Sequence, residues 1–189
     1  MKVAIVYHSG HGHTRVVAEA IADGANQMEG VWADLVHVTE IESPDQLSQY
    51  DGMVFGSPTY MGSVSGPFKT FMDSTACLWF ARAWKDKLAG GFTNSHSLSG
   101  DKFNTLVQLV TFASQHQMNW VSLGLANESG YGDLPSGHEK AVNHMGSFLG
   151  LMAQSENESP EITPPSGDLK TARLYGERFA QAVIRWNQA

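Results

Sequence analysis

The sequence contains a single cysteine, Cys77, among 189 residues, which excludes an internal disulfide and a multi-cysteine metal site. The apolar neighbours of Cys77 predict a packed core residue rather than a nucleophile. Basic residues are also scarce: 12 Lys and Arg stand against 19 Asp and Glu, and the formal net charge is −7. Without a Lys/Arg cluster, no nucleic-acid partner is expected. Long apolar runs and signal-peptide features are missing as well, so we expect a cytoplasmic protein without a membrane span.

Strand-like and helix-like stretches alternate along the chain. Apolar runs typical of strands lie at residues 3–7, 31–38, 52–56, 88–92 and 119–123. Apolar residues at helical spacing lie at 13–28, 67–80, 101–115 and 169–186. The alternation predicts parallel βαβ units in a single α/β domain over residues 1–189. Five such strands fit a doubly wound parallel sheet with strand order 2-1-3-4-5 and helices on both faces.

One long segment, at about residues 126–168, does not fit this alternation. It is rich in Gly and Pro and stands between the fifth predicted strand and the last predicted helix. Segments of this length inside a compact domain are usually functional or mediate assembly. We therefore predict a long insertion before the last helix.

The first strand-like run, residues 3–7, is apolar throughout, which is typical of a strand covered on both faces. It ends in a loop of small and hydroxylated residues that leads directly into helix-like sequence. Such a loop can bind phosphate through backbone N–H groups and hydroxyls at the positive end of the helix. An ordinary strand-to-helix turn is the alternative. The candidate phosphate residues are Ser9, Gly10, His11, Gly12, His13 and Thr14.

Neither of the best-known phosphate motifs is present in this loop. A P-loop requires Lys before its Ser or Thr, and a dinucleotide loop requires three spaced glycines, whereas only Gly10 and Gly12 occur. A loop that lacks Lys and Arg favours a mononucleotide monophosphate over a triphosphate with its metal. We expect no metal site, because His11 and His13 lie in a turning loop that no cysteine or carboxylate cluster completes.

Two further polar loops follow predicted strands, at residues 57–63 and 93–98. The carboxyl ends of parallel strands meet at one edge of the sheet, so we expect these loops to converge with residues 9–14. Their candidate ligand-binding residues are Pro58, Thr59, Tyr60, Met61 and Gly62 in one loop and Thr93, Asn94, Ser95, His96 and Ser97 in the other. Three uncharged loops without an evident acid, base or nucleophile favour a planar, phosphate-bearing cofactor that supplies its own chemistry. Flavin mononucleotide (FMN) fits that description.

Two more residues are candidates at this end of the sheet. Trp79 can form the wall of a planar pocket, with a core aromatic as the alternative. His116 can donate a hydrogen bond to a substrate oxygen, with a helix-end or surface residue as the alternative.

Several segments resemble the WrbA-type NAD(P)H:quinone oxidoreductases, which have a flavodoxin-like fold. They are residues 9–13 (SGHGH), 55–62 (FGSPTYMG), 65–73 (SGPFKTFMD) with Leu78-Trp79 after it, and 116–118 (HQM). The resemblance implies an FMN phosphate site at residues 9–14 and contacts of Thr59, Tyr60 and Met61 with the isoalloxazine. It also implies that Trp79 lines the substrate side and that His116 is a catalytic residue that binds substrate.

The chain departs from the family pattern at two places. Residues 143–148 read NHMGSF where the family carries a P-Y-G-A-type stretch, in a region where neighbouring subunits help to complete the site. His11 stands where the family often has Tyr.

The resemblance implies an FMN-dependent oxidoreductase that passes two electrons from NADH or NADPH to a quinone or similar planar acceptor. It also implies a homo-oligomer, either a dimer or a tetramer. The alternative is a flavodoxin-type electron carrier that docks on redox partner proteins through its acidic surface. A flavin-binding module that associates with a partner protein is a third possibility, for which the sequence has no specific mark.

Overall fold

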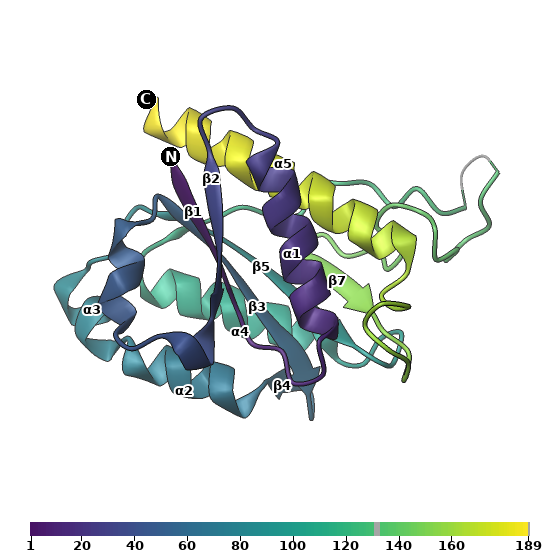
Figure 1. Ribbon diagram of the computed structural model, residues 1–189, viewed down its shortest axis with the longest axis horizontal. Helices are drawn as coiled ribbons and strands as arrows, with labels where there is room; N and C mark the ends of the chain where they lie inside the picture. Colours follow the sequence, from purple (N-terminus) through teal and green to yellow (C-terminus); the bar gives the residue numbers. More distant parts are fainter. Residues whose placement is uncertain (131–132, 189) are drawn as a thin grey trace.

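The computed structural model describes residues 1–130 and 133–188, and shows a twisted parallel sheet between two layers of helices (Figure 1). The strands are β1 Lys2–Tyr7, β2 Trp32–His37, β3 Gly52–Tyr60, β4 Ser63–Val64, β5 Leu88–Ser95, β6 Asn119–Trp120 and β7 Leu151–Gln154. The helices are α1 His13–Asn26, α2 Gly66–Ser74, α3 Ala76–Ala81, α4 Lys102–Gln115 and α5 Ser166–Asn187, with 3₁₀ turns η1 Val38–Glu40 and η2 Pro44–Gln49. Helices α1 and α5 cover one face of the sheet, and α2, α3 and α4 cover the other.

The sheet has the predicted doubly wound topology. Its order is β2-β1-β3-β5-β6, and the hairpin strand β4 pairs with β3 off this path. The fifth position differs from the prediction, because two short strands share it. β6 pairs with Leu88 and Ala89 at the start of β5, and β7 pairs with residues 92–95 at its end.

The predicted insertion is therefore wrong in its bounds, since β7 lies inside residues 126–168. The chain leaves the sheet after Trp120 and returns at Gly150, where a Cβ would lie only 2.5 Å from the carbonyl oxygen of Gly91. Trp120 Nε1 donates to the carbonyl of Leu149 at 2.7 Å and ties the two ends of the excursion together. Residues 131–132 of the predicted insertion lie outside the described residues.

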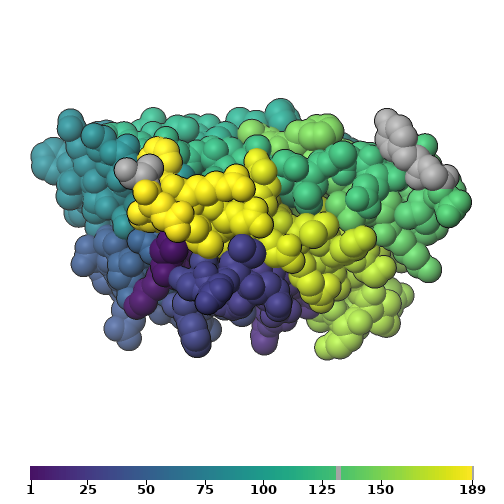
Figure 2. Space-filling view, turned by 90° about the horizontal axis from the view of Figure 1, so that it is seen from above, coloured from purple at the N-terminus to yellow at the C-terminus, as the bar shows by residue number. Residues whose placement is uncertain are grey.

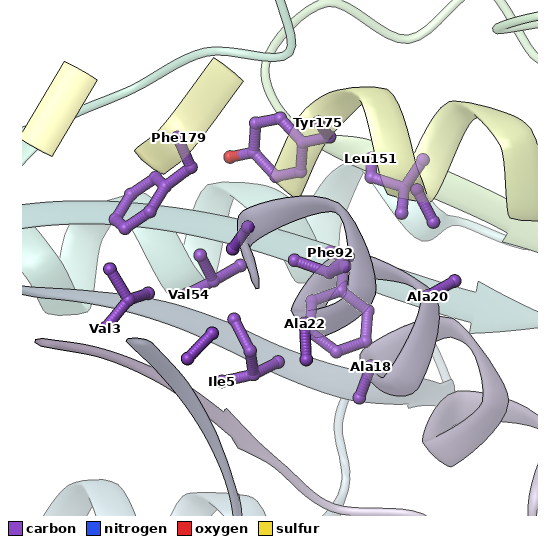
Figure 3. Close-up of a cluster of buried hydrophobic side chains, with 14 of the residues drawn as sticks. Val3, Ile5, Ala18, Ala20, Ala22, Val54, Phe92, Leu151, Tyr175 and Phe179 are labelled. Atoms are coloured by element: carbon purple, nitrogen blue, oxygen red, sulfur yellow. The ribbon is translucent and has the colours of Figure 1, made fainter. Parts of the chain in front are cut away.

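The helices α1 and α5 pack closely side by side, as Figures 1 and 2 show. Two glycines permit this contact: a Cβ on Gly24 would lie 1.9 Å from the carbonyl oxygen of Arg173, and one on Gly176 would lie 2.0 Å from that of Ile21. Beneath them, apolar side chains from β1, β3, β5, β7 and α5 form one continuous cluster (Figure 3). Burial of each large aliphatic or aromatic side chain there contributes about 1.5–3 kcal/mol.

On the other face, the helix predicted at residues 67–80 is broken at Thr75 into α2 and α3. The Thr75 side chain donates to the carbonyl of Met72 at 2.7 Å, which accompanies the end of α2. Only Leu78 of α3 is buried, so Cys77 is exposed and the prediction of a core cysteine was wrong. None of the helices described is both long and apolar enough to cross a lipid bilayer.

Candidate functional site

The three predicted loops converge at the carboxyl ends of the strands, around a cavity of about 580 Å³. Eight of the predicted residues line it: His11, His13, Thr14, Pro58, Tyr60, Asn94, Ser95 and His96. A volume of this order is typical of small-molecule and cofactor sites. The convergence was predicted from topology alone, and the structure agrees with it.

Ser9 organises the first loop from behind the cavity. Its side-chain oxygen accepts hydrogen bonds from the N–H groups of Gly12 at 3.1 Å and Arg15 at 3.2 Å. Its own N–H donates to Nε2 of His37 at 3.3 Å. Gly12 has a φ of 91° and lies against Pro160, where a Cβ would be 2.9 Å from Cγ, so only glycine fits this position without strain.

The N-terminus of α1 is open toward the cavity. Its N-cap residue, Gly12, has no side chain to cap it, and its first turn contains no acidic residue. Within the described part of the chain, the N–H groups of His13 and Thr14 have no acceptor. Arg15, the one formally charged residue in this turn, pairs with Glu19 at 2.7 Å. The positive end of the helix is thus left for an external anion.

The second predicted loop is mostly strand. β3 continues through Tyr60, and Met61 and Gly62 form a two-residue turn that leads into β4. Their φ values of 50° and 75° are those that such hairpin turns require. Met61 consequently lies at the tip with its side chain 102% exposed, and neither Met61 nor Gly62 lines the cavity. Tyr60 does line it, and its hydroxyl lies over Gly10, where a Cβ would be 2.7 Å away.

Thr59 and Thr93 point into the protein, not into the cavity. Thr93 Oγ1 donates to the carbonyl of Ser57 at 2.7 Å, so Thr59 must donate to Thr93, at 2.8 Å. Thr105 of α4 then donates to Thr59, also at 2.8 Å. This buried chain of hydroxyls holds β3, β5 and α4 together below the site. Any ligand contact of Thr59 or Thr93 is therefore left to backbone atoms.

The third loop is shorter than predicted, because β5 continues through Ser95. Ser97 turns away from the cavity, and its carbonyl accepts a hydrogen bond from Lys102 Nζ at 2.5 Å. Lys102 is fully buried, and this burial lowers its pKa to about 8. A second buried group lies nearby, where His144 Nε2 pairs with Asp168 at 2.9 Å, and this hydrogen bond raises the pKa of His144.

A fourth wall of the cavity was missed by sequence reasoning. It consists of Ser155, Glu156, Asn157 and Glu158, directly after β7. Ser155 donates from its N–H to the Ser95 carbonyl at 3.1 Å and from its hydroxyl to Asn94 Oδ1 at 3.0 Å. His13 Nε2 donates to the Glu158 carbonyl at 2.8 Å and closes the wall onto α1. The signal was the apolar run at residues 148–153, which contains most of β7 inside the predicted insertion.

Trp79 and His116 lie elsewhere. They line a second cavity of about 550 Å³ between α2, α3 and α4. His116 ends α4, three residues before β6 begins beside Leu88, so it lies at the amino ends of the strands. Leu88 and Ser95 mark the two ends of β5, about 23 Å apart at roughly 3.3 Å per residue. The prediction that Trp79 and His116 share one end of the sheet with the loops was therefore wrong within a single copy of the chain.

The contacts of His116 fix its ring proton on Nε2. Since Thr75 Oγ1 donates to Met72, it accepts from His116 Nε2 at 2.8 Å, and the lone pair is left on Nδ1. This Nδ1 is buried and has no partner in the described ranges. Burial lowers the pKa of His116 to about 4, so the ring is neutral near pH 7. Its neighbours are Trp84 and Phe112, whose rings lie 4.4 and 4.9 Å away.

The residues of the first cavity fit FMN. The open N–H groups of His13 and Thr14 suit its phosphate, and the glycines at 10 and 12 let Tyr60 and Pro160 approach where any Cβ would collide. Tyr60 and Pro58 offer flat apolar surface to a ring, and Asn94, Ser95 and His96 offer polar groups to its edge. Throughout residues 1–130 and 133–188, no three His, Cys, Asp or Glu side chains gather into a metal-binding group.

Comparison with known proteins agrees with this fold. Residues 41–128 match the family of NADPH-dependent FMN reductases. The chain is 45% identical to "Flavodoxin FldP" of Pseudomonas aeruginosa, over 95% of both chains. It is 29% identical to an "NAD(P)H dehydrogenase (quinone)" of Geobacter sulfurreducens, over 99% of this chain and 100% of that one.

Among solved structures, the chain is similar to the flavodoxin, WrbA-like protein from Agrobacterium tumefaciens, with a TM-score of 0.72 and 40% identity. The match covers 97% of this chain and 98% of that one. The chain therefore belongs to the flavodoxin-like superfamily and, within it, to the WrbA-type proteins.

Proposed function

We propose that the chain is an FMN-dependent oxidoreductase that passes two electrons from NADH or NADPH to a quinone or similar planar acceptor. The observation that carries the proposal is the cavity of about 580 Å³ at the carboxyl ends of the strands, lined by His13 and Thr14, whose N–H groups have no acceptor among the described residues. The match of residues 41–128 to the family of NADPH-dependent FMN reductases, and a relative named as a quinone dehydrogenase, support the reaction type.

FMN, when bound, supplies hydride acceptance and electron transfer, and the protein holds and orients it. We propose that Gly10, His11, His13 and Thr14 bind the phosphate, with Ser9 and Gly12 fixing the loop around it. The ring then lies between Pro58–Tyr60 and residues 94–96, with the wall at residues 155–158 closing the phosphate end. The reductant and the acceptor use the same exposed face in turn, which predicts ping-pong kinetics.

Anaerobic spectroscopy tests this proposal. Protein reconstituted with FMN is mixed with NADH or NADPH, and the flavin absorbance should bleach and then recover when a benzoquinone is added. If neither nicotinamide bleaches a bound flavin, the proposed reaction is wrong.

We further propose that Trp79 and His116 act on the flavin of a neighbouring copy, in a dimer or tetramer. Within one copy they lie too far from the cavity, yet the rim beside them is apolar and exposed: Trp79 is 47% and Phe80 84% exposed. Exposed apolar groups of this kind are typical of association surfaces. Because the Nε2–H of His116 is donated to Thr75 in this structure, donation to a quinone oxygen requires that His116 exchange this hydrogen bond for one to the substrate.

A complementation experiment separates action within one copy from action between copies. Thr14→Asp is designed to lose FMN, and His116→Ala to lose the histidine while keeping FMN. If His116 acts on a neighbour, co-refolding the two inactive variants restores part of the quinone reductase activity. If it acts only within its own copy, the mixture stays inactive.

The flavodoxin-type electron carrier is the second candidate, and the 45% identity to a protein named flavodoxin favours it. The formal net charge of −7 is compatible with docking on a basic redox partner. A potentiometric titration distinguishes the two. A carrier accumulates one-electron-reduced flavin over a wide range of potential, whereas the proposed reductase passes directly to the two-electron-reduced form.

A further inference from the structure

The phosphate loop depends on a histidine outside it. His37 is the last residue of β2, beside Tyr7 in the parallel pairing with β1. Its Nε2 accepts the N–H of Ser9 at 3.3 Å, and its Nδ1 lies 2.7 Å from Thr39 Oγ1. Because an N–H donates to Nε2, that nitrogen must carry the lone pair, and the ring proton belongs on Nδ1, where it is donated to Thr39.

This contact continues into the N-terminus of α1. His37 holds Ser9 through the backbone N–H of Ser9. The hydroxyl of the same serine accepts the N–H groups of Gly12 and Arg15. These two bonds occupy some of the donors at the start of the helix and leave those of His13 and Thr14 open to the cavity. The position of Ser9 therefore decides which amides a phosphate meets.

A protonated His37 is incompatible with this arrangement. The imidazolium carries hydrogen on both nitrogens, so Nε2–H would face Ser9 N–H across 3.3 Å and one of the two would have to move. Histidine is the side chain whose ordinary titration range includes the pH values found in cells.

The groups around His37 do not replace its lone pair. The ring of Tyr7 meets it edge-on at 5.2 Å, and that of His8 lies 5.5 Å away. Burial and the neighbouring His37 both lower the pKa of His8, which favours its neutral form. Thr39 of η1 accepts the Nδ1–H of His37, and the charges of Arg15, Glu19 and Glu40 act on the hydroxyl of the neighbouring Tyr7.

We propose that His37 is a positioning residue for the phosphate loop and that it couples FMN retention to pH, because it can accept the Ser9 N–H only while neutral. The coupling rests on the proposed function, since it acts on the same phosphate site. It adds a regulation of that site: acidification releases FMN, and the release is controlled from β2.

The test compares wild type with His37→Gln and His37→Ala, and with His138→Gln as a control in the insertion. The FMN dissociation constant is measured by flavin fluorescence quenching from about pH 8 to about pH 5.5. The phosphate of FMN also titrates near pH 6, so each variant is compared with wild type at the same pH.

Gln offers an acceptor oxygen that does not titrate. His37→Gln should bind FMN within about threefold of wild type at the higher pH and lose about tenfold less affinity on acidification. His37→Ala should bind about tenfold more weakly than wild type already at the higher pH.

A pH response of His37→Gln equal to that of wild type and of His138→Gln would overturn the coupling. So would an unchanged affinity of His37→Ala at the higher pH. A second measurement needs neither FMN nor a variant. In the flavin-free protein, the amide NMR resonances of Ser9, Gly12 and Arg15 should titrate together with the His37 ring. If these amide resonances do not follow the His37 ring, the coupling is wrong even where FMN binds. Failure of wild type to bind FMN would instead contradict the proposed function. In that case the NMR result still decides whether the coupling exists.

Discussion

The two cavities of this molecule are built in opposite ways. The cavity at the carboxyl ends of the strands is formed by loops, with backbone N–H groups, small hydroxylated residues and imidazoles around it. The cavity at the amino ends is formed by helices, with apolar and long side chains around one buried histidine. In the first, recognition depends on where the chain ends its strands and begins α1. In the second, it depends on which side chains the helices present.

The difference explains why the convergence of the three loops was predicted correctly, whereas Trp79 and His116 were placed at the wrong end of the sheet. Strand ends converge because of topology, so residues 9–14, 57–63 and 93–98 meet whatever their identity. A helix, in contrast, carries the chain back across the sheet. The predicted helix at 101–115 is long enough to return to the amino ends, so His116 had to lie there.

The largest expected effect belongs to the carboxyl-end cavity. Thr14→Asp places a carboxylate at the positive end of α1, where it suits the helix but repels a phosphate. FMN affinity should fall about a thousandfold, roughly 4 kcal/mol, while riboflavin affinity changes little. Because Thr14 is only 2% exposed, the new carboxylate should also lower the free energy of unfolding. Fluorescence titration and urea denaturation measure the two quantities, with Thr70→Asp on α2 as the control. FMN affinity within about threefold of wild type would contradict the phosphate assignment.

The second effect concerns the helix layers on which the cavities depend. Gly176→Ala puts a methyl group 2.0 Å from the carbonyl oxygen of Ile21, so α5 must move away from α1. The free energy of unfolding should fall by about 3 kcal/mol. Gly66→Ala at the start of α2 meets nothing within 4 Å and should change it by less than about 0.5 kcal/mol. Equal losses in the free energy of unfolding for the two variants, measured by urea denaturation, would show that the close α1–α5 contact does not require glycine at position 176.

A smaller effect concerns the amino-end cavity, where the buried His116 should make the free energy of unfolding depend on pH. The pKa of His116 is about 4 in the folded protein and 6.5 in an unfolded chain, so the unfolded state takes up the proton first as the pH falls. Wild type should therefore lose stability between about pH 7 and about pH 5, by about 1.5 kcal/mol after allowance for solvent screening. His116→Gln should lack this part of the loss in denaturation curves at the two pH values. An identical loss in the variant would mean that His116 is not buried in its neutral form.

The smallest effect compares one aromatic residue from each cavity. Tyr60→Ser removes a wall of the carboxyl-end cavity and should weaken FMN binding about fivefold, near 1 kcal/mol. Trp79→Ser, an equally exposed change on α3, should leave FMN affinity unchanged. If Trp79→Ser weakens FMN binding as much as Tyr60→Ser does, then Trp79 also contacts the flavin. In the proposed oligomer, Trp79 would then lie closer to the flavin of the neighbouring copy than we expect.

Sequence reasoning found the layers, the strand order and the helices, because apolar periodicity reports burial directly. It set β3 and β5 too short, since Ser57, Pro58 and Asn94 are not typical strand residues. Buried hydroxyl bonds, which depend on tertiary contacts, hold these positions in the sheet. β7 was missed for a different reason, because a four-residue strand in a Gly- and Pro-rich segment has little periodicity to detect. The wall at residues 155–158, which follows β7, was missed with it.

The central claim is that the carboxyl-end cavity is an FMN phosphate site. It is tested most directly by titrating flavin-free protein with FMN and with riboflavin, which differ only in the phosphate, and following flavin fluorescence. The account predicts one FMN per chain, bound at least about a hundredfold more tightly than riboflavin. Equal affinities for the two flavins, or no quenching by either, would contradict it.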